Sequence, residues 1–188
     1  GTLADARVCN REAAGGALPG SNDPLYLGST TFTLTDVDGR KETMLRFHAA
    51  HITFKPYIVV AGQTVTQDAA CPYEVKAGMF PAETDFGGKA AGEETLFRPS
   101  MVAFPEQDRY GGVCELPLFE EDTQAVVMVF DSKSGEKVAE VSLREYMAEH
   151  GIRLAGKEEI VIEMLISISG TNVTIKLPVW EEDNIFPA

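Results

Sequence analysis

Basic residues and long apolar runs are scarce in this chain, and each scarcity excludes a class of partner. The 188 residues include 16 Lys and Arg against 29 Asp and Glu, a formal net charge of −13. Nucleic acid is therefore not an expected partner, because phosphate binding needs a basic surface, and an anionic membrane surface is disfavoured for the same reason. No apolar run approaches the roughly 20 residues of a membrane-spanning helix. No secretory signal opens the chain, so we expect a cytosolic protein or one whose targeting segment has been removed, and Gly1 favours a processed start.

Cysteine and histidine are few as well. Cys9, Cys71 and Cys114 are too few for a disulfide scaffold, and none forms a CxxC pair typical of a structural zinc site. A Cys71–Cys114 bridge would contribute about 4 kcal/mol in the chain-entropy model, and this pairing stays open against two separate thiols. The odd spacing of His48 and His51 points them to opposite faces of a strand, so we expect no shared metal site.

Recognised catalytic motifs are missing. The sequence contains no GxSxG, HExxH, Walker loop or GxGxxG. The segment Phe86-Gly87-Gly88-Lys89 has glycines but not the GxxxxGK[ST] frame of a phosphate loop, and the histidines are too scattered to offer a general base. We therefore predict a non-enzymatic protein with no catalytic, cofactor-binding or metal-binding residues.

The strongest hydrophobic pattern lies in the C-terminal third. Residues 125–130 form an apolar run rich in β-branched residues, which is typical of a strand covered on both faces. Further on, apolar residues alternate over 160–168 and again over 173–179, with a Gly/Asn turn between them. This pattern predicts a β-hairpin with its aliphatic face in the core. That face comprises Ile160, Ile162, Met164, Ile166 and Ile168, continued by Val173, Ile175, Leu177 and Val179.

One short helix is predicted between these strands. Ser142-Leu143-Arg144-Glu145 matches the capping box, in which a serine hydroxyl and a glutamate carboxylate satisfy backbone donors reciprocally. Gly151 suits the left-handed residue that ends a helix after His150. The helix spans about two turns, so it depends on packing more than on propensity.

The remaining chain is rich in short strands and turns. Weak to moderate strand patterns cover 2–9, 31–35, 44–47 and 52–60, and Pro56 inside the last of these indicates a sheet edge or a bulge. Residues 63–94 show little periodicity, which predicts either a surface excursion or a binding loop. Residues 95–119 read as short strands broken by prolines. The sum predicts an all-β protein, a β-sandwich of one or two modules with one short helix.

The order of these features resembles a known family. An apolar strand and an Asp…Gly turn lead to Ser142-Leu143-x-x-Tyr146-Met147, then to the alternating hairpin closed by Trp180. Upstream, Leu25-Tyr26-Leu27-Gly28, Leu45-x-Phe47 and Ala50-x-Ile52-x-Phe54 fit the same family. The pattern is similar to the second domain, and the passage between domains, of minor fimbrial subunits and anchors of Bacteroides-type (type V) pili, the FimB-like family.

The resemblance implies an architecture and a role. It implies transthyretin-like β-sandwiches, with residues 1–40 as the remnant of a first domain and 41–188 as a complete second one. It also implies an exported lipoprotein precursor at the outer membrane and cell surface, acting in adhesion and joined to other pilus subunits by strand exchange, with host or bacterial surface ligands as further partners. The sequence departs from the family in having no lipidation cysteine near its start and too few residues before Asp36 for a whole first domain. A surface carbohydrate- or protein-binding β-sandwich is the alternative, and an enzyme of unrecognised type has no positive feature.

Exposed strand edges are the expected interface. A sandwich of short strands leaves unpaired N–H and C=O groups along its edges, which an extended peptide can pair with. The candidate edges are short, rich in Thr or Ala and close to the apparent truncation. They comprise Thr2, Ala4, Ala6, Val8, Thr31, Thr33 and Thr35. The alternative is that these edges are covered within the chain.

Overall fold

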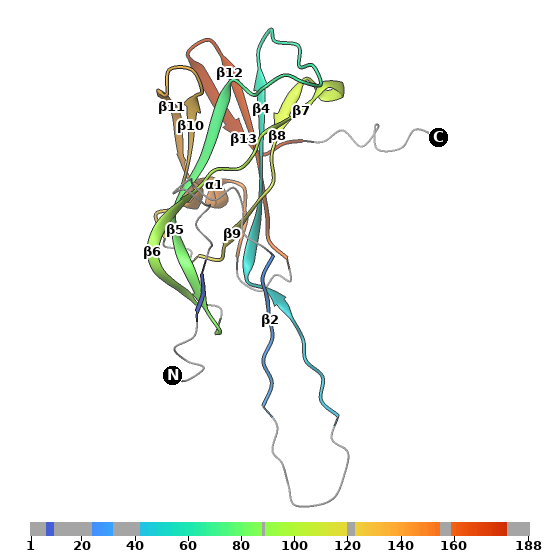
Figure 1. The fold of residues 1–188 in the computed structure, drawn as a ribbon, viewed down its shortest axis with the longest axis vertical. Helices are drawn as coiled ribbons and strands as arrows, with labels where there is room; N and C mark the ends of the chain where they lie inside the picture. Colours follow the sequence, from blue (N-terminus) through green and yellow to red (C-terminus); the bar gives the residue numbers. More distant parts are fainter. Residues whose placement is uncertain are drawn as a thin grey trace, which may run out of the picture.

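The computed structural model describes residues 7–9, 24–31, 42–87, 89–119, 123–154 and 159–179. The described strands form two large sheets that enclose a core and a third, two-stranded sheet at the base of a narrow arm that extends from one end; one short helix lies beside the large sheets (Figure 1). The prediction of an all-β sandwich with a single short helix is confirmed for the described part of the chain.

The first sheet has five strands. They are β1 (Arg7–Cys9), β5 (Tyr73–Asp85), β6 (Ala90–Phe97), β10 (Val126–Asp131) and β11 (Lys137–Ser142). The long strand β5 is central, because Ala77 pairs with both Phe97 of β6 and Val127 of β10, which places these two strands on opposite sides of it. β1 pairs with the far end of β5, and β11 lies beyond β10.

The second sheet has six strands. They are β4 (His51–Val60), β7 (Val102–Phe104), β8 (Arg109–Gly111), β9 (Cys114–Pro117), β12 (Val161–Ser169) and β13 (Asn172–Lys176). β4 is the axis of this sheet, with β12 parallel to it on one side and β9 and β8 antiparallel to it in succession on the other. A short 3-10 turn, η2 (Pro105–Gln107), connects β7 to β8.

The predicted aliphatic face of β12 lies in the core. Ile160, Ile162, Met164, Ile166 and Ile168 are all at most 3% exposed. They pack with buried residues of both sheets, which confirms the predicted register of this strand. Beyond Lys176, however, the predicted continuation is wrong: β13 ends there, and Leu177 and Val179 are exposed.

Pro56 lies in a central strand, so the edge reading is wrong. The backbone carbonyl of Pro56 accepts a hydrogen bond from the N–H of Gly112, which lies in the two-residue gap between β8 and β9. Proline has no N–H to donate to a neighbouring strand. On the side of β4 that the Pro56 nitrogen faces, the pairing with β8 and β9 is already interrupted, so no donor is needed there. The irregularity that the proline predicted is present, but it falls in the partner strands.

Residues 63–94, predicted as irregular, include all of β5 and most of β6. The register of this long hairpin shifts between Ala77 and Phe80 and again between Pro81 and Glu83. Met79 lies at the first shift with a φ of 61°. Each shift breaks the two-residue alternation on which strand prediction depends, so the longest hairpin of the fold looked like a loop.

The helix α1 (Leu143–Glu149) forms as predicted. The Ser142 hydroxyl accepts a hydrogen bond from the backbone N–H of Glu145, and Gly151 has the left-handed φ of 64° just past the end. Strand β10 also forms, but only Val127 and Val129 are fully buried on it, so the expectation that both faces are covered is wrong. On its other face, Lys76 lies over the ring of Phe130 at 4.3 Å.

Candidate functional site: a projecting arm and its base

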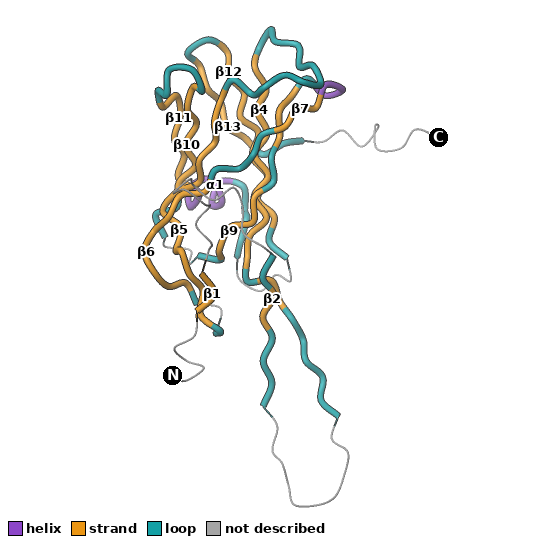
Figure 2. The backbone as a smooth tube through the Cα atoms, in the orientation of Figure 1, coloured by secondary structure: helices purple, strands orange, loops and turns teal. Residues whose placement is uncertain are grey.

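A two-stranded arm, residues 24–31 and 42–49, extends away from the sandwich. β2 (Tyr26–Leu27) and β3 (His48–Ala49) pair antiparallel at its base. Figure 2 shows the two legs beyond this pair running outward as loop. The predicted strand at 44–47 is therefore wrong, because the ladder is limited to the two residues nearest the sandwich.

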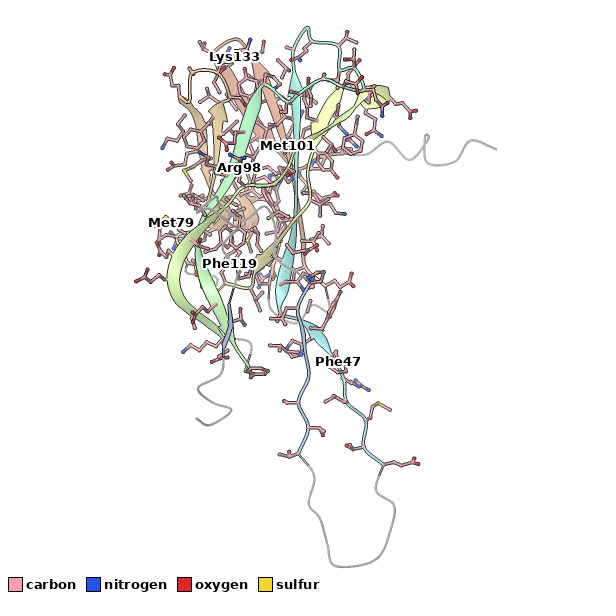
Figure 3. The ribbon with its side chains drawn as sticks, in the orientation of Figure 1. Phe47, Met79, Arg98, Met101, Phe119 and Lys133 are labelled. Carbon is pink, nitrogen blue, oxygen red and sulfur yellow. The ribbon has the colours of Figure 1, made fainter. Side chains whose placement is uncertain are left out.

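Large apolar side chains on the arm face solvent. Met44 is 76% exposed, Phe47 62%, Tyr26 47% and Leu45 41%. Figure 3 shows Phe47 on the arm, clear of the sandwich. A single exposed apolar residue needs no explanation, but a group of this size on one projecting element is typical of a contact surface.

The base of the arm is fixed by His51, which is 6% exposed. Its Nδ1 lies 2.9 Å from the carbonyl oxygen of Leu25 and 3.2 Å from the backbone nitrogen of the same residue. The ring of Tyr26 meets the imidazole edge to face, with centroids 5.2 Å apart. The backbone N–H of Ala50 donates to the Leu25 carbonyl at 2.7 Å. Ala50, which directly precedes β4, and His51, the first residue of β4, therefore both hold the first leg of the arm.

A carboxylate continues this cluster into the sheet. Oε2 of Glu115 lies 3.4 Å from Nε2 of His51 and accepts a hydrogen bond of 2.8 Å from the Thr53 hydroxyl. Because Glu115 is on β9 and Thr53 is on β4, the contact links the two strands beneath the arm. His48 is exposed on β3. Within the described residues, no group of three or more His, Cys, Asp and Glu side chains is placed to hold a metal ion.

The same sheet carries an aromatic and cationic cluster farther along its outer face. The guanidinium of Arg109 lies 4.5 Å from the centroid of the Tyr57 ring and 6.0 Å from that of Phe104. Tyr57 packs over Gly111, where an added Cβ would lie 2.9 Å from each of the two rings. Burial raises the pKa of Tyr57 and the Glu163 carboxylate raises it further, while the Arg109 cation acts in the opposite direction.

A shallow groove of about 440 Å³ lies beside the helix. It is lined by Arg144, Met147, Ala148, Gly151, Ile152 and Arg153. In a chain of net charge −13, its described lining offers two cations and no carboxylate.

The predicted strand-edge residues fall partly within the described chain. Val8 lies in β1 and pairs with Thr84 of β5, and Thr31 is exposed on the arm outside any strand. Thr2, Ala4, Ala6, Thr33 and Thr35 lie outside the described residues, so the edge interface stays a prediction. Cys71 and Cys114, whose pairing the sequence left open, are not joined to each other by a disulfide, and Cys114 is buried.

Comparison with known proteins shows what the chain is similar to. No protein-family model matches the sequence, and no curated protein matches it. Among solved structures, a candidate polysaccharide-binding protein of Bacteroides thetaiotaomicron has a TM-score of 0.67 at 14% identity over 98% of this chain and 69% of its own. A candidate adhesin of the same species has a TM-score of 0.59 at 10% identity over 83% and 59%. The fimbrial anchor protein Mfa2 of Porphyromonas gingivalis has a TM-score of 0.54 at 13% identity over 82% and 57%.

These structural neighbours agree with the resemblance seen in the sequence, since they include a fimbrial anchor and adhesin-like proteins. At sequence identities of 10%, 13% and 14%, this structural similarity shows only that the chain shares the fold of these proteins. The chain spans 57%, 59% and 69% of the lengths of these three proteins. None of the described helices is both long and apolar enough to cross a bilayer.

Proposed function

We propose that this chain is a non-enzymatic subunit or anchor of a cell-surface fimbria, and that it contacts neighbouring subunits through extended β-strands. The observation that carries the proposal is the arm, which projects from the sandwich and carries exposed apolar side chains. Burying such a surface against a partner stabilises a complex by about 25 cal/mol per Å² of apolar area, before the cost of association is subtracted.

The backbone of the arm supports the same role. Residues 43–47 and 28–31 belong to no strand, so the proposal assigns their N–H and C=O groups to pairing with an added strand. In this proposal residues 1–40 are the remnant of a first sandwich, and its strand β1 pairs with β5 of the second sandwich, which residues 41–188 form. The arm then lies where the two domains and the neighbouring subunit meet. Export to the outer membrane and a lipid anchor on the precursor are part of the same proposal.

Incorporation into fimbriae tests this role. The full-length protein should be expressed in its own bacterium, and fimbriae sheared from the cells should be probed with an antibody. Met44→Asp combined with Phe47→Asp should lower the amount in the fimbrial fraction at least tenfold, because charged groups cannot be buried in an apolar contact without a large cost.

Matched controls separate the arm from surface hydrophobicity in general. Val113 and Val102 are 57% and 54% exposed, close to the 62% of Phe47, but lie on the sandwich, so Val113→Asp with Val102→Asp should leave incorporation unchanged. All variants should first show the wild-type unfolding transition. Wild-type incorporation of the arm variant would contradict the proposal.

Binding of a surface carbohydrate is the second candidate function, and the stack of Arg109 on Tyr57 and Phe104 favours it. Aromatic rings beside a fixed guanidinium supply both apolar area and directional donors, a combination found in polar ligand sites. Bacterial surface glycans should be screened on the purified chain. If a glycan binds the wild-type chain and Arg98→Ala but not Arg109→Ala, its binding site is this cluster. If no glycan in the screen binds, carbohydrate binding as a function is rejected.

A further inference from the structure

The histidine at the arm base meets two opposed backbone groups with one nitrogen. The N–H of Leu25 points toward Nδ1 of His51, and the carbonyl oxygen of Leu25 also lies within hydrogen-bond distance of that nitrogen. One ring nitrogen cannot accept from the N–H and donate to the carbonyl at the same time. The protonation state of His51 therefore decides which group of Leu25 it binds.

The second ring nitrogen limits the choice to two states. Nε2 faces the Glu115 carboxylate, which is an acceptor when ionised, so this nitrogen carries a proton in the favourable states. The neutral ring then has a bare Nδ1, which accepts from the N–H of Leu25. The protonated ring carries hydrogen on both nitrogens, so it donates to the Leu25 carbonyl and forms an ion pair with Glu115.

We propose that His51 is a proton-controlled latch that sets how firmly the arm is held to the sandwich. In the protonated state the bond from Nδ1 to the Leu25 carbonyl is charge-assisted, and such a bond is roughly twice as strong as a neutral one. The arm base is therefore held more firmly at low pH and less firmly when the ring is neutral. The inference rests on the proposed function in treating the arm as the contact surface, since the latch would regulate the presentation of that surface.

The surroundings of His51 supply the groups that such a latch needs. The titratable groups that contact the ring from the described elements are Glu115 on β9 and Tyr26 on β2. On its own strand, the Thr53 hydroxyl orients the Glu115 carboxylate. The Leu25 carbonyl accepts from the N–H of Ala50 in either state, so release by His51 does not leave that oxygen unpaired.

Nuclear magnetic resonance on the whole isotope-labelled chain tests the latch. The protein has three histidines, and single His48→Gln and His150→Gln variants assign their ring signals. The amide signal of Leu25 should shift with pH at the midpoint of the His51 ring. The amides of 26–27 and 48–49 should exchange about fivefold to tenfold more slowly with His51 protonated than in His51→Gln at the same pH.

His48→Gln is the matched control, because His48 is exposed three residues away and should leave the Leu25 midpoint and the exchange of the 26–27 amides unchanged. A Leu25 amide that does not follow the His51 ring, or that keeps its midpoint in His51→Gln, would overturn the latch. If His51→Gln does not fold, the comparison of the Leu25 and His51 midpoints in the wild-type chain decides alone. These measurements need no fimbrial partner, so a failed incorporation test with intact coupling would reject the role of the arm and not the latch.

Discussion

The hydroxyl of Tyr146 donates a hydrogen bond of 2.6 Å to the backbone carbonyl of Glu163. Strand β13 pairs with β12 along residues 165–169, so Glu163 lies past the end of that ladder. The tyrosine on α1 thus donates to a carbonyl of β12 that lies beyond the part of the strand paired with β13. This contact explains why a helix of only seven residues is kept between β11 and β12, with Leu143, Tyr146 and Met147 buried against the core.

Removing this hydroxyl should weaken the fold. Tyr146→Phe removes this hydrogen bond to the Glu163 carbonyl, and we expect a loss of about 1 kcal/mol in the free energy of unfolding. Urea denaturation at neutral pH measures the change. Tyr26→Phe is the control, because Tyr26 is half exposed, and it should change stability by less than about 0.5 kcal/mol.

The same tyrosine predicts a loss of stability in alkali. Burial, followed by the Glu163 and Glu149 carboxylates, raises the pKa of Tyr146 to about 12. The folded state therefore holds this proton more tightly than the unfolded chain, so the contribution is complete below pH of about 10 and is lost as the pH rises through about 12. With a discount for solvent screening, it amounts to roughly 1–2 kcal/mol.

Comparison of two proteins isolates this contribution. Tyr57 and Tyr110 also have raised pKa values, so the wild-type curve alone contains several groups. The stability difference between wild type and Tyr146→Phe should shrink between pH 9 and pH 12 in the direction just derived. A difference that stays constant over that range would show that Tyr146 does not titrate differently in the two states.

The centre of the core can be tested at Met164, which is fully buried. Met164→Ala should cost roughly 2–5 kcal/mol, because it removes buried methylene groups and leaves a cavity. Val161 lies on the opposite face of the same strand and is exposed, so Val161→Ala should cost less than about 0.5 kcal/mol. Equal costs at the two positions would contradict the alternating register of β12.

The structural features that could be predicted from the sequence are those that depend on local patterns. The alternation over 160–168, the serine cap and the glycine stop of the helix all depend on residues close together in the chain. The β5–β6 hairpin was missed because register shifts reset its alternation. The contacts at the arm base could not be read from spacing: His51 meets Leu25 26 residues away, and Thr53 meets Glu115 62 residues away.

Gly111 tests whether the aromatic cluster is closely packed. An alanine methyl there would lie 2.9 Å from both Tyr57 and Phe104, so the rings must move apart. Gly111→Ala should therefore cost about 1–3 kcal/mol and loosen the stack of Arg109 on Tyr57. Repeating the substitution in a Tyr57→Ala, Phe104→Ala background should remove most of the cost, and an unchanged cost would assign it to the backbone.

The two candidate strand edges should behave differently toward a donor peptide. Residues 7–9 already pair with β5, whereas Thr31 is exposed and belongs to no strand. In the isolated chain, the amides at 31–35 should exchange fast, and those at 7–9 should be slower. A synthetic extended peptide taken from a partner subunit should slow exchange at 31–35 at least tenfold if it adds as a strand, because each paired amide then opens only when the ladder does.

A scrambled peptide is the control. Equal exchange at 31–35 with and without the donor would remove the physical basis for assembly through this edge. New protection confined to the side of β1 that faces away from β5 would move the interface to Val8 and its neighbours.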